Sequence, residues 1–376
     1  MRLELAQMSN NEELLEFYSR FPLENSMQLK LDRGRDFFKY YNVQSDQFVS
    51  YILRDDKSTI LGHVAFVIET VLIEGKATRI AWSRDLRISP ERKAILEWTE
   101  HIKDVFAEVR KIFGVEYFMT SLNMNEVVAL NTFTRPRSQK RFMPRYFLYR
   151  KFDLVSLHGQ FPFTYAPDSK LKIRRGNPSQ ADLYINYLLK KNQDYAFSLY
   201  TNKENFLETM DRWTSLSWED FFIAFDSKDN IVGMMSSWSS AGVQDFIPLR
   251  YSLLAHNFRQ FLKFGKLFSW SRTLTKPYHR IKIEASLNFR SLNHIYVDHP
   301  DVFHSLLWKA YDEARDNEFL VYARDRKNIN LKPPLGWIAA EQTYGLYCTV
   351  LPDEETPSFL HPSHEGLMNL ETTRLI

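Results

Sequence analysis

Residues 77–98, ATRIAWSRDLRISPERKAILEW, place two cations where a phosphate group could be held. The first half is typical of a strand that stops at Pro90, and the second half is typical of the start of a helix. The first turn of a helix exposes unpaired N–H groups at the positive end of its dipole. Arg92 and Lys93 fall in this turn, and the N–H groups just before it add a concave anion site. The stretch therefore predicts a diphosphate site, with a purely structural corner as the alternative.

Strand alternation divides the residues before Pro90 between two faces. Leu86 and Ile88 share one face, which we expect to be buried in the core. Asp85, Arg87 and Ser89 share the other face. The charged face of this strand is the one that could contact a polar ligand.

Composition limits the class of protein. The chain has 376 residues, which favours two domains, and 44% hydrophobic and 25% charged residues, as in soluble globular proteins. The net charge of +3 argues against a dedicated polyanion binder, so nucleic acid is an unlikely partner. One cysteine, Cys348, excludes an intramolecular disulfide and a cysteine-based metal site.

Neither terminus nor interior carries a membrane signal. The first residues, MRLELAQMSNNEELL, lack the apolar stretch of a signal peptide. No segment approaches the roughly 20 apolar residues that a membrane span needs. We therefore expect a cytoplasmic protein without a membrane span. The pairs His299 with His304 and His361 with His364 lack a third ligand at suitable spacing, so no metal is expected.

A short pattern occurs twice in the chain. Residues 55–62 read DDKSTILG and residues 226–233 read DSKDNIVG, each between two β-prone segments. Polar turn residues followed by a glycine predict a hairpin at each place. The similarity of the two stretches suggests that the chain contains an internal repeat.

The elements predicted around the two hairpins follow the same order, β-α-α-β-β-β-α-β, with a further strand after each copy. In the first half we predict these elements at 2–7, 11–21, 34–42, 47–54, 63–73, 79–89, 94–113, 115–122 and 145–154. In the second half we predict them at 171–176, 179–192, 203–216, 220–225, 234–238, 291–297, 302–317, 318–324 and 336–351. The fold class is therefore α/β (α+β), with a mixed, mostly antiparallel sheet flanked by helices in each of two domains.

The domain boundaries follow from this order and from composition. We predict a first domain at 1–158, a linker at 159–169 where Pro, Gly and polar residues cluster, and a second domain at 170–352. Residues 250–280 form an extra helical segment of the second domain, which either covers an acyl or lipid pocket or packs on its own domain. Residues 353–376 form a polar tail, either disordered or docked as a strap.

This succession resembles the GNAT (acetyl-CoA-dependent N-acetyltransferase) superfamily, present twice. The motif that carries the resemblance is RDLRISPERK, residues 84–93, which is similar to the family's fourth strand and the loop after it. The resemblance implies that the strand, with Leu86, Arg87 and Ile88, pairs with the pantetheine arm of acetyl-CoA or a longer acyl-CoA. It also implies that Arg92, Lys93 and Ala94 hold the pyrophosphate, and that Asn125 belongs to the site.

The chain departs from the family where glycines are usual. Lys93, Ala94 and Ile95 stand in place of the glycines that let a backbone approach a pyrophosphate closely. The corresponding stretch of the second half, VDHPDVFH, has no glycine or arginine and places Asp298 and Asp301 at the helix start. These carboxylates would repel a phosphate, so the second copy is predicted to be degenerate.

Acyl transfer to an amine needs a group that takes a proton from the amine and a group that protonates the leaving thiolate. The resemblance implies an acidic residue near the fourth strand as the base. Asp85 is the nearest candidate, followed by Glu116 at the start of the next strand. The acid stays unassigned, because Asn131 stands near the place where the family often has a tyrosine.

The sequence thus predicts an acyl-CoA-dependent N-acyltransferase, and more specifically an N-acetyltransferase, acting on an unknown small-molecule or protein amine. One alternative is a catalytically dead binding or scaffolding protein. Another is a transferase that uses a different acyl donor, such as aminoacyl-tRNA, with residues 135–151 as its anion surface. That run is the most basic in the chain, and a solvated loop followed by a strand explains it as well. Its cations are Arg135, Arg137, Lys140, Arg141, Arg145, Arg150 and Lys151.

Overall fold

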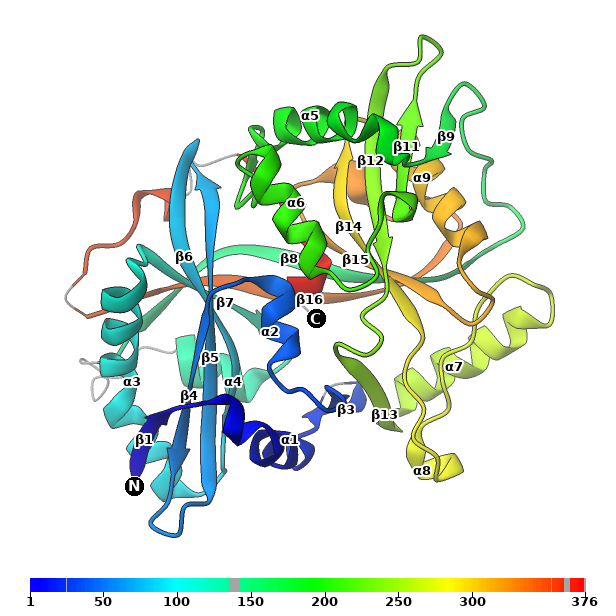
Figure 1. Cartoon of the computed structure of the whole chain (residues 1–376). Coiled ribbons are helices and arrows are strands. Elements are labelled where there is room, and N and C mark those ends of the chain that lie inside the picture. The colour runs from blue at the N-terminus through cyan, green and yellow to red at the C-terminus, as the bar shows by residue number, and fades with distance from the viewer. Residues whose placement is uncertain (25, 135–142, 353, 362–365, 375–376) are drawn as a thin grey trace.

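The computed structural model describes residues 1–24, 26–134, 143–352, 354–361 and 366–374. The molecule has two lobes, with the first half of the chain in one and most of the second half in the other (Figure 1). Among the described residues, every helix is too short or too polar to reach across a bilayer.

The N-terminal half contains four helices and eight strands among the described residues. The helices are α1 (Asn11–Ser19), α2 (Lys39–Gln44), α3 (Arg92–Phe113) and α4 (Val127–Thr134). The strands are β1 (Arg2–Leu5), β2 (Leu23–Glu24), β3 (Met27–Asp32), β4 (Phe48–Arg54), β5 (Ile60–Ile73), β6 (Lys76–Ile88), β7 (Tyr117–Asn123) and β8 (Arg145–Gln160).

The C-terminal half has a similar but not identical order. It has one short strand between its first two helices, an insertion between β12 and β14, and no described α-helix between β15 and β16. The described helices are α5 (Ala181–Asn192), α6 (Lys203–Arg212), α7 (Leu253–Lys266), α8 (Tyr278–Ile281) and α9 (Pro300–Glu313). The strands are β9 (Lys172–Arg175), β10 (Tyr195–Ala196), β11 (Phe221–Phe225), β12 (Ile231–Trp238), β13 (Asp245–Tyr251), β14 (Phe289–Val297), β15 (Phe319–Asp325), β16 (Trp337–Val350) and β17 (Leu367–Met368).

One 12-stranded sheet runs through both lobes, in the order β1-β4-β5-β6-β7-β16-β8-β15-β14-β12-β11-β9. Most neighbours in it are antiparallel, and the pairs β6–β7 and β14–β15 are parallel. The helices α3 and α9 bridge these two parallel pairs, because parallel strands need a crossover connection. The mixed, mostly antiparallel α/β fold expected from the sequence is confirmed.

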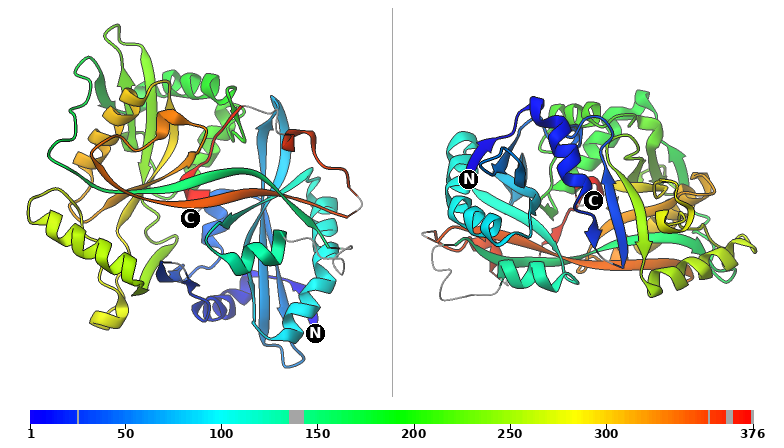
Figure 2. Two further views of the ribbon diagram at one scale, coloured as in Figure 1. Left: turned by 180° about the vertical axis from the view of Figure 1, so that it is seen from behind. Right: turned by 90° about the horizontal axis from the view of Figure 1, so that it is seen from below.

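The long strands β8 and β16 belong to both lobes at once (Figure 2). The stretch 344–349 of β16 pairs with β7, so the last part of the chain completes the sheet of the first half. In return, residues 152–157 of β8 pair with β15 in the second half. The predicted domain boundaries at 158 and 170 remain a prediction. Because β8 pairs with β15 and β16 pairs with β7, dividing the chain at these residues would separate paired strands.

Two hydrophobic cores and a small second sheet connect the elements around the central sheet. The core beneath α3 contains Trp98, Ile102 and Phe106 packed on β4, β5 and β6. A larger core fills the space between α1 and α2 of one half and α5 and α6 of the other. A small sheet, β13-β3-β2, crosses between the halves, since β3 pairs with β13 from Asp32 to Met27. This sheet was missed in the sequence because its strands are short and lack a clear alternation.

Both hairpins predicted from the repeated pattern are confirmed. Residues 55–59 connect β4 to β5, and residues 226–230 connect β11 to β12. Ser58 and Asp229 take the left-handed backbone conformation at matching places in the two turns, with φ of 66° and 60°. Each turn is closed by an aspartate, Asp55 or Asp226, whose carboxylate accepts from backbone N–H groups two and four residues on.

Candidate active site

The strands β6 and β7 separate and leave an opening in the sheet. They pair only at Ile80–Trp82 with Tyr117–Met119, although β6 continues to Ile88 and β7 to Asn123. A bulge at Asp85, where φ is 55°, bends β6 away from its neighbour. Backbone groups along the separated strands then lack strand partners. Side chains serve some of them, since Ser83 O accepts from Thr120 Oγ1 at 3.3 Å and Asp85 O from the Tyr18 hydroxyl at 2.6 Å.

A cavity of about 270 Å³ occupies this opening, which we call the gap cavity. Apolar side chains from α3 and β5 line one end, and side chains from α2, β3 and β13 line the other. The walls include Val64, Phe66, Ser83, Arg84, Asp85, Leu86, Arg87, Trp98, Ile102, Phe106, Thr120, Ser121, Leu122, Asn123, Glu126, Phe133, Tyr146 and Tyr344, together with Leu23, Leu31, Tyr40, Gln244 and Phe246. The cavity therefore joins the α3 side of the sheet to the space between the halves.

The matching opening of the C-terminal half is filled by the chain's own tail. There β14 pairs with β15 only at Phe289–Ser291 and Phe319–Val321, and a bulge lies at His294, where φ is 52°. Thr372 lies between the separated strands, donating through Oγ1 to Leu292 O at 2.7 Å and accepting from Ala323 N at 3.0 Å. The carboxylate of Glu371 accepts from His294 N at 2.9 Å. The described part of the tail is thus a docked strap.

Residue size also distinguishes the two openings. The bulge at Asp85 corresponds to the bulge at His294, and the β6–β7 pairing corresponds to the β14–β15 pairing. By this correspondence, Ser83 is equivalent to Leu292 and Thr120 is equivalent to Tyr322. Leu292 and Tyr322 are fully buried, whereas Ser83 and Thr120 line the gap cavity. Small polar side chains therefore keep the first opening free, and large ones together with the strap close the second.

The start of α3 follows the end of β6, but Arg92, Lys93 and Ala94 do not line the gap cavity, and their role in holding a phosphate stays a prediction. Only Ser89, Pro90 and Glu91 separate β6 from α3, so the connection is short and has no glycine. Ala94 is fully buried, while Arg92 and Lys93 are exposed at the helix start. The Lys93 ammonium lies 3.9 Å from Asp56, a carboxylate on the β4–β5 hairpin. The helix start thus offers its N–H groups and one cation that no described carboxylate pairs with.

Asp85 lies in a buried ion pair on the cavity wall. Its Oδ2 accepts from Arg33 Nη2 and from the Tyr41 hydroxyl, both at 2.6 Å. Arg33 is 3% exposed and is surrounded by the rings of Tyr18, Phe37, Tyr40 and Tyr41, with its guanidinium carbon 4.4 to 5.6 Å from their centroids. Arg33 also donates to Gln244 Oε1 at 2.9 Å, which ties the second half to this network.

This environment makes Asp85 a poor general base. Burial raises its pKa, but the charges of Arg33 and Arg87 and the hydrogen bonds from Tyr41 and Arg33 outweigh burial and lower the pKa to about 2. A carboxylate with that pKa stays ionised at neutral pH and accepts a proton weakly. Asp85 is better suited to a structural role, because it forms the ion pair that fixes the position of Arg33 beside the cavity wall.

Glu116, the second predicted base, lies at the wrong end of its strand. It precedes β7, whereas the strands separate towards the other end, beyond Met119. Its carboxylate is solvent-exposed and 3.8 Å from Lys76. The sequence places Glu116 near the fifth strand but does not show at which end that strand meets the opening, and the structure corrects the prediction.

The other predicted contact residues divide into two groups. Leu86 and Arg87 line the gap cavity, and Ile88 packs against the core beneath α3. Asn125 is exposed just after β7, with its N–H donating to Asn123 Oδ1 at 3.0 Å. Asn125 is therefore near the rim of the cavity rather than on its wall.

Two wall residues with suitable chemistry were not chosen from the sequence. Glu126 provides a carboxylate at the start of the segment leading into α4. Tyr146, on β8, has a hydroxyl whose pKa is raised by burial, so it stays protonated at neutral pH. The only signal for Glu126 in the sequence was its carboxylate shortly after the predicted fifth strand. The residues around Tyr146 contain no pattern that indicates a position at the cavity.

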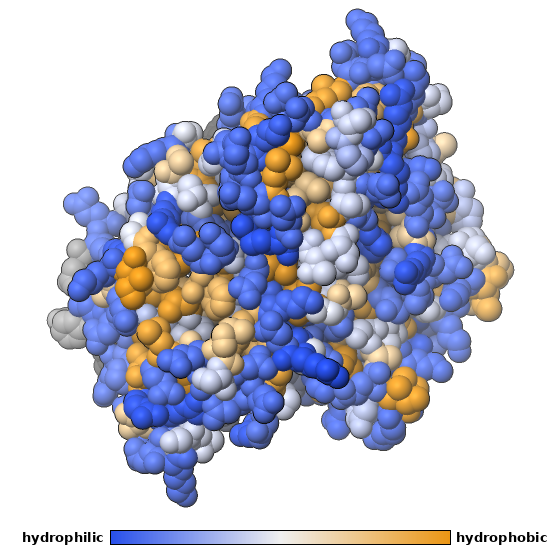
Figure 3. Space-filling model, viewed as in Figure 1, coloured by the Kyte–Doolittle hydropathy of each residue, from blue (hydrophilic) through white to orange (hydrophobic). Residues whose placement is uncertain are grey.

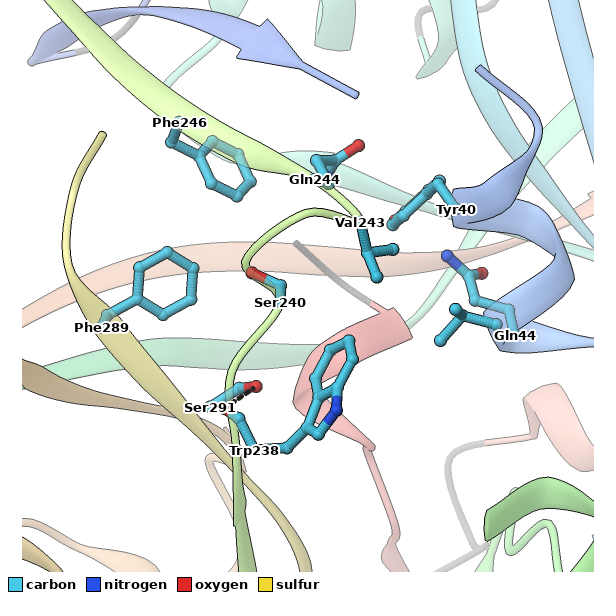
Figure 4. A pocket seen from close by; sticks show the side chains of 10 residues that line it. Tyr40, Gln44, Trp238, Ser240, Val243, Gln244, Phe246, Phe289 and Ser291 are labelled. Carbon is cyan, nitrogen blue, oxygen red and sulfur yellow. Dashed lines mark hydrogen bonds between the residues drawn. The ribbon is translucent and has the colours of Figure 1, made fainter. Parts of the chain in front are cut away.

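A second, smaller cavity adjoins the gap cavity between the halves (Figure 4). Tyr40, Gln244 and Phe246 line both cavities. In Figure 4, Tyr40 and Gln44 of α2 face Val243 and Gln244 of the segment entering β13. The remaining walls are mostly apolar and include Val43, Trp238 and Phe289.

The predicted basic run is described only in part. Arg135, Arg137, Lys140 and Arg141 lie outside the described residues. Arg150, by contrast, is buried on β8 and donates to Asp325 of β15 at 2.8 Å. Arg150 therefore serves the contact between the halves.

Comparison with known proteins identifies the fold. No protein-family model and no curated protein matches the sequence. Among solved structures, Saccharomyces cerevisiae N-myristoyltransferase with bound myristoyl-CoA is similar over 98% of this chain and 89% of its own, with a TM-score of 0.54 and 11% identity. The chain has a GNAT-like fold.

Two further solved structures are similar to the chain. A GCN5-related N-acetyltransferase from Sphaerobacter thermophilus covers 82% of each chain at a TM-score of 0.50 and 9% identity. A probable N-acyltransferase from Enterococcus faecalis covers 93% of this chain and 73% of its own, also at 0.50 and 9%.

Proposed function

We propose that the chain is an acyl-CoA-dependent N-acyltransferase that binds its acyl donor in the gap cavity of the N-terminal half. The observation that carries the proposal is the contrast between two equivalent openings, one an open cavity and the other filled by Thr372 and Glu371. The C-terminal half then serves as a structural unit that supplies one wall of the acceptor space. The N-terminal unit, within residues 1–158, is the acyl-CoA unit, as the sequence predicted.

The parts of an acyl-CoA match the parts of the site. The diphosphate would lie at the start of α3, where N–H groups and Arg92 favour an anion. The pantetheine amides would pair with the free backbone groups of β6 beside Leu86 and Arg87. The acyl chain would extend towards Trp98, Ile102 and Phe106, an apolar end that suits acetyl or longer chains.

The chemistry needs two proton transfers. The acceptor nitrogen attacks the thioester carbonyl, the C–N bond forms as the C–S bond breaks, and the amine proton passes to a base. We propose Glu126 as that base, directly or through one water, because it is the wall carboxylate that no described guanidinium neutralises. We propose Tyr146 as the proton donor to the leaving thiolate because its side chain lines the gap cavity; burial raises the pKa of its hydroxyl and makes it a weaker acid. Asp85 acts as a positioning residue through Arg33.

Replacing Thr120 by Tyr tests where the donor binds, because Tyr322 stands at the equivalent place in the filled opening. We expect Thr120→Tyr to weaken binding of acyl-CoA at least about tenfold, since the ring would occupy the gap cavity. Titration calorimetry with acetyl-CoA and with medium- and long-chain acyl-CoAs measures the loss. Thr201→Tyr, at an exposed position in the other half, is the matched control.

A charge reversal at the helix start separates phosphate binding from cavity shape. Arg92→Glu should weaken every acyl-CoA, whereas Lys111→Glu, the same reversal at the other end of α3, should not. If the unmodified chain binds no acyl-CoA of any length, the N-acyltransferase proposal fails and an inactive binding protein takes its place. Binding that survives Thr120→Tyr would place the donor elsewhere.

A further inference from the structure

Arg84 lies on the wall of the gap cavity, and its guanidinium forms no ion pair with a described carboxylate, although the charge of Glu69 acts on it at longer range. The residue is 9% exposed, and its Nε and Nη2 atoms are buried without a hydrogen-bond partner among the described residues. The guanidinium carbon lies 5.3 Å from the centroid of the Trp82 ring. A buried cation without a counterion is strongly unfavourable, so its presence in a cavity indicates a missing anion.

The carboxylates nearest in the fold already have other partners. Asp85 is held by Arg33 and Tyr41. The carboxylate of Glu69 accepts from the Trp82 indole at 2.7 Å and pairs with Arg374. Across the described part of the chain, no carboxylate oxygen lies within 4.0 Å of the Arg84 guanidinium. Glu69 acts on Arg84 only through longer-range charge interaction, so the guanidinium keeps its hydrogen-bonding groups free for an anionic ligand in the cavity.

The position of Arg84 assigns this anion to the acceptor side. Arg84 follows Trp82, the last residue of β6 that pairs with β7, so it stands where the opening begins. Its side chain shares the face of Trp82, which belongs to the core between the halves and not to the core beneath α3. Tyr40 and Gln244, on the same side, lead on into the second cavity.

We propose that the acceptor amine carries an anionic group, a carboxylate or a phosphate, which Arg84 binds. The proposal rests on the function proposed above and specifies its substrate class. A guanidinium presents paired N–H groups that match two oxygens of either anion. With the anion on Arg84, the amine of the same molecule faces the opening between β6 and β7.

Paired amines test this assignment. Phenylalanine is compared with phenethylamine, and phosphoethanolamine with ethanolamine, by following CoA release from the acyl-CoA that binds best. We expect the anionic member of at least one pair to have a kcat/KM at least about 100-fold higher, and Arg84→Met to reduce that ratio to nearly one. The pair that responds tells a carboxylate from a phosphate. Arg84→Lys keeps the charge without the fork and should retain part of the ratio.

The outcomes separate this inference from the proposed function. Without acceptor, Arg84→Met should be at least as thermostable as the unmodified chain, since it removes an unpaired buried charge. A large loss of stability would mark Arg84 as structural and overturn the inference, even if acyl-CoA binds. Equal kcat/KM within both pairs, or a ratio unchanged in Arg84→Met, also overturns it. The inference is also overturned if the unmodified chain prefers succinyl-CoA to acetyl-CoA and Arg84→Met loses this preference, because Arg84 would then bind an anion of the acyl donor.

A second and independent feature is the inserted segment 250–284, whose exposed side chains combine bulky apolar groups with cations. The segment has eight Lys and Arg residues and one acidic residue, Glu284, which pairs with Lys30 at 2.7 Å. α7 and α8 project from one edge of the molecule (Figure 1). Figure 3 shows apolar patches among hydrophilic residues over this edge.

α7 packs through a narrow face and leaves the rest exposed. Ala255, Leu262 and Gly265 are buried against the protein. Leu253 and Leu267 are 77% and 78% exposed. The other exposed apolar residues here are Leu254, Phe261, Phe264, Phe268 and Ile283, and Phe163 adjoins them through the stacked ring of Phe161. In the described part of the chain, no carboxylate pairs with the cations Lys263, Lys266, Lys276, Arg280 and Lys282.

We infer that the apolar-basic surface of 250–284 binds an anionic lipid bilayer. An amphipathic helix with Leu and Phe on one side and Lys and Arg beside them inserts its apolar side chains at the boundary between headgroups and acyl chains. The cations then meet anionic headgroups. Aliphatic side chains such as Leu253 and Leu267 do not stack on bases, which favours a bilayer over a nucleic acid.

Vesicle sedimentation tests the surface. The chain should sediment with vesicles of phosphatidylcholine and phosphatidylglycerol and much less with phosphatidylcholine alone. Lys263→Glu with Lys266→Glu should reduce partitioning at least about tenfold, and Leu267→Glu with Phe268→Glu should do the same. Ile112→Glu, on an exposed position of α3, and Lys190→Glu, on α5, are the matched controls. Equal binding to both vesicles, an unchanged response in the variants, or a dimer that the same variants dissociate would overturn the inference.

Discussion

Removing the carboxylate of Asp85 should destabilise the chain by about 3 to 5 kcal/mol, because Arg33 would remain charged and buried without its partner. The double variant Asp85→Leu with Arg33→Met should recover most of that loss, since it removes both charges. Equilibrium unfolding in urea measures both free energies. As a control, Glu16→Ala breaks the exposed pair with Arg20 and should change the unfolding free energy by no more than about 1 kcal/mol.

The same pair predicts how stability depends on acid. The pKa of Asp85 is about 2 in the folded chain, below the roughly 3.9 of an unfolded aspartate. The stabilisation is therefore complete above about pH 4 and is lost as pH falls from about 4 to 2, a change of about 2.6 kcal/mol. Asp85→Asn should lack this component of the acid slope. An unchanged slope in Asp85→Asn would contradict the ion pair.

Local patterns in the sequence were sufficient to predict most elements. Period-two alternation and turn residues located both hairpins, and the 3.6-residue period located α3 and α7. The resemblance of RDLRISPERK to the GNAT fourth strand, and not the alternation, implied that Leu86 and Arg87 lie together at the ligand site, and both line the gap cavity. The predicted resemblance to the GNAT superfamily agrees with the fold found by structural comparison.

The missing parts of the prediction depend on contacts between distant residues. Arg33 and Asp85 are 52 positions apart, and nothing in either neighbourhood identifies the other as its partner. In the structure β16 of the second half pairs with β7, and β8 of the first half pairs with β15. The hydrophobic periodicity of a strand does not determine which distant strand it pairs with. The strap at 371–372 was invisible for the same reason, since a polar tail has the same composition whether it docks or not. Side-chain roles at a site follow from such non-local partners.

Glu371 should make docking of the strap depend on pH near neutrality. Burial raises the pKa of this carboxyl group to about 7, although the His294 N–H and Arg374 oppose the effect. An unfolded glutamate has a pKa of about 4.3, so the docked state holds its proton to higher pH than the released state does. Docking is therefore strongest below about pH 4, weakens as pH rises towards 7, and is about 3 to 4 kcal/mol weaker above that value.

Glu371→Gln should remove most of this dependence, because the amide oxygen still accepts from His294 N and the side chain cannot ionise. Hydrogen exchange of the amides in 367–374 between pH 5 and 8, corrected for the intrinsic rates, measures strap release. Glu355→Gln, an exposed position in the same tail, should leave the pH dependence unchanged. An equal pH dependence in Glu371→Gln and the unmodified chain would contradict the assignment. Since Thr372 joins Leu292 to Ala323, release of the strap also frees the backbone groups of β14 and β15, and the second opening should then become accessible above pH 7.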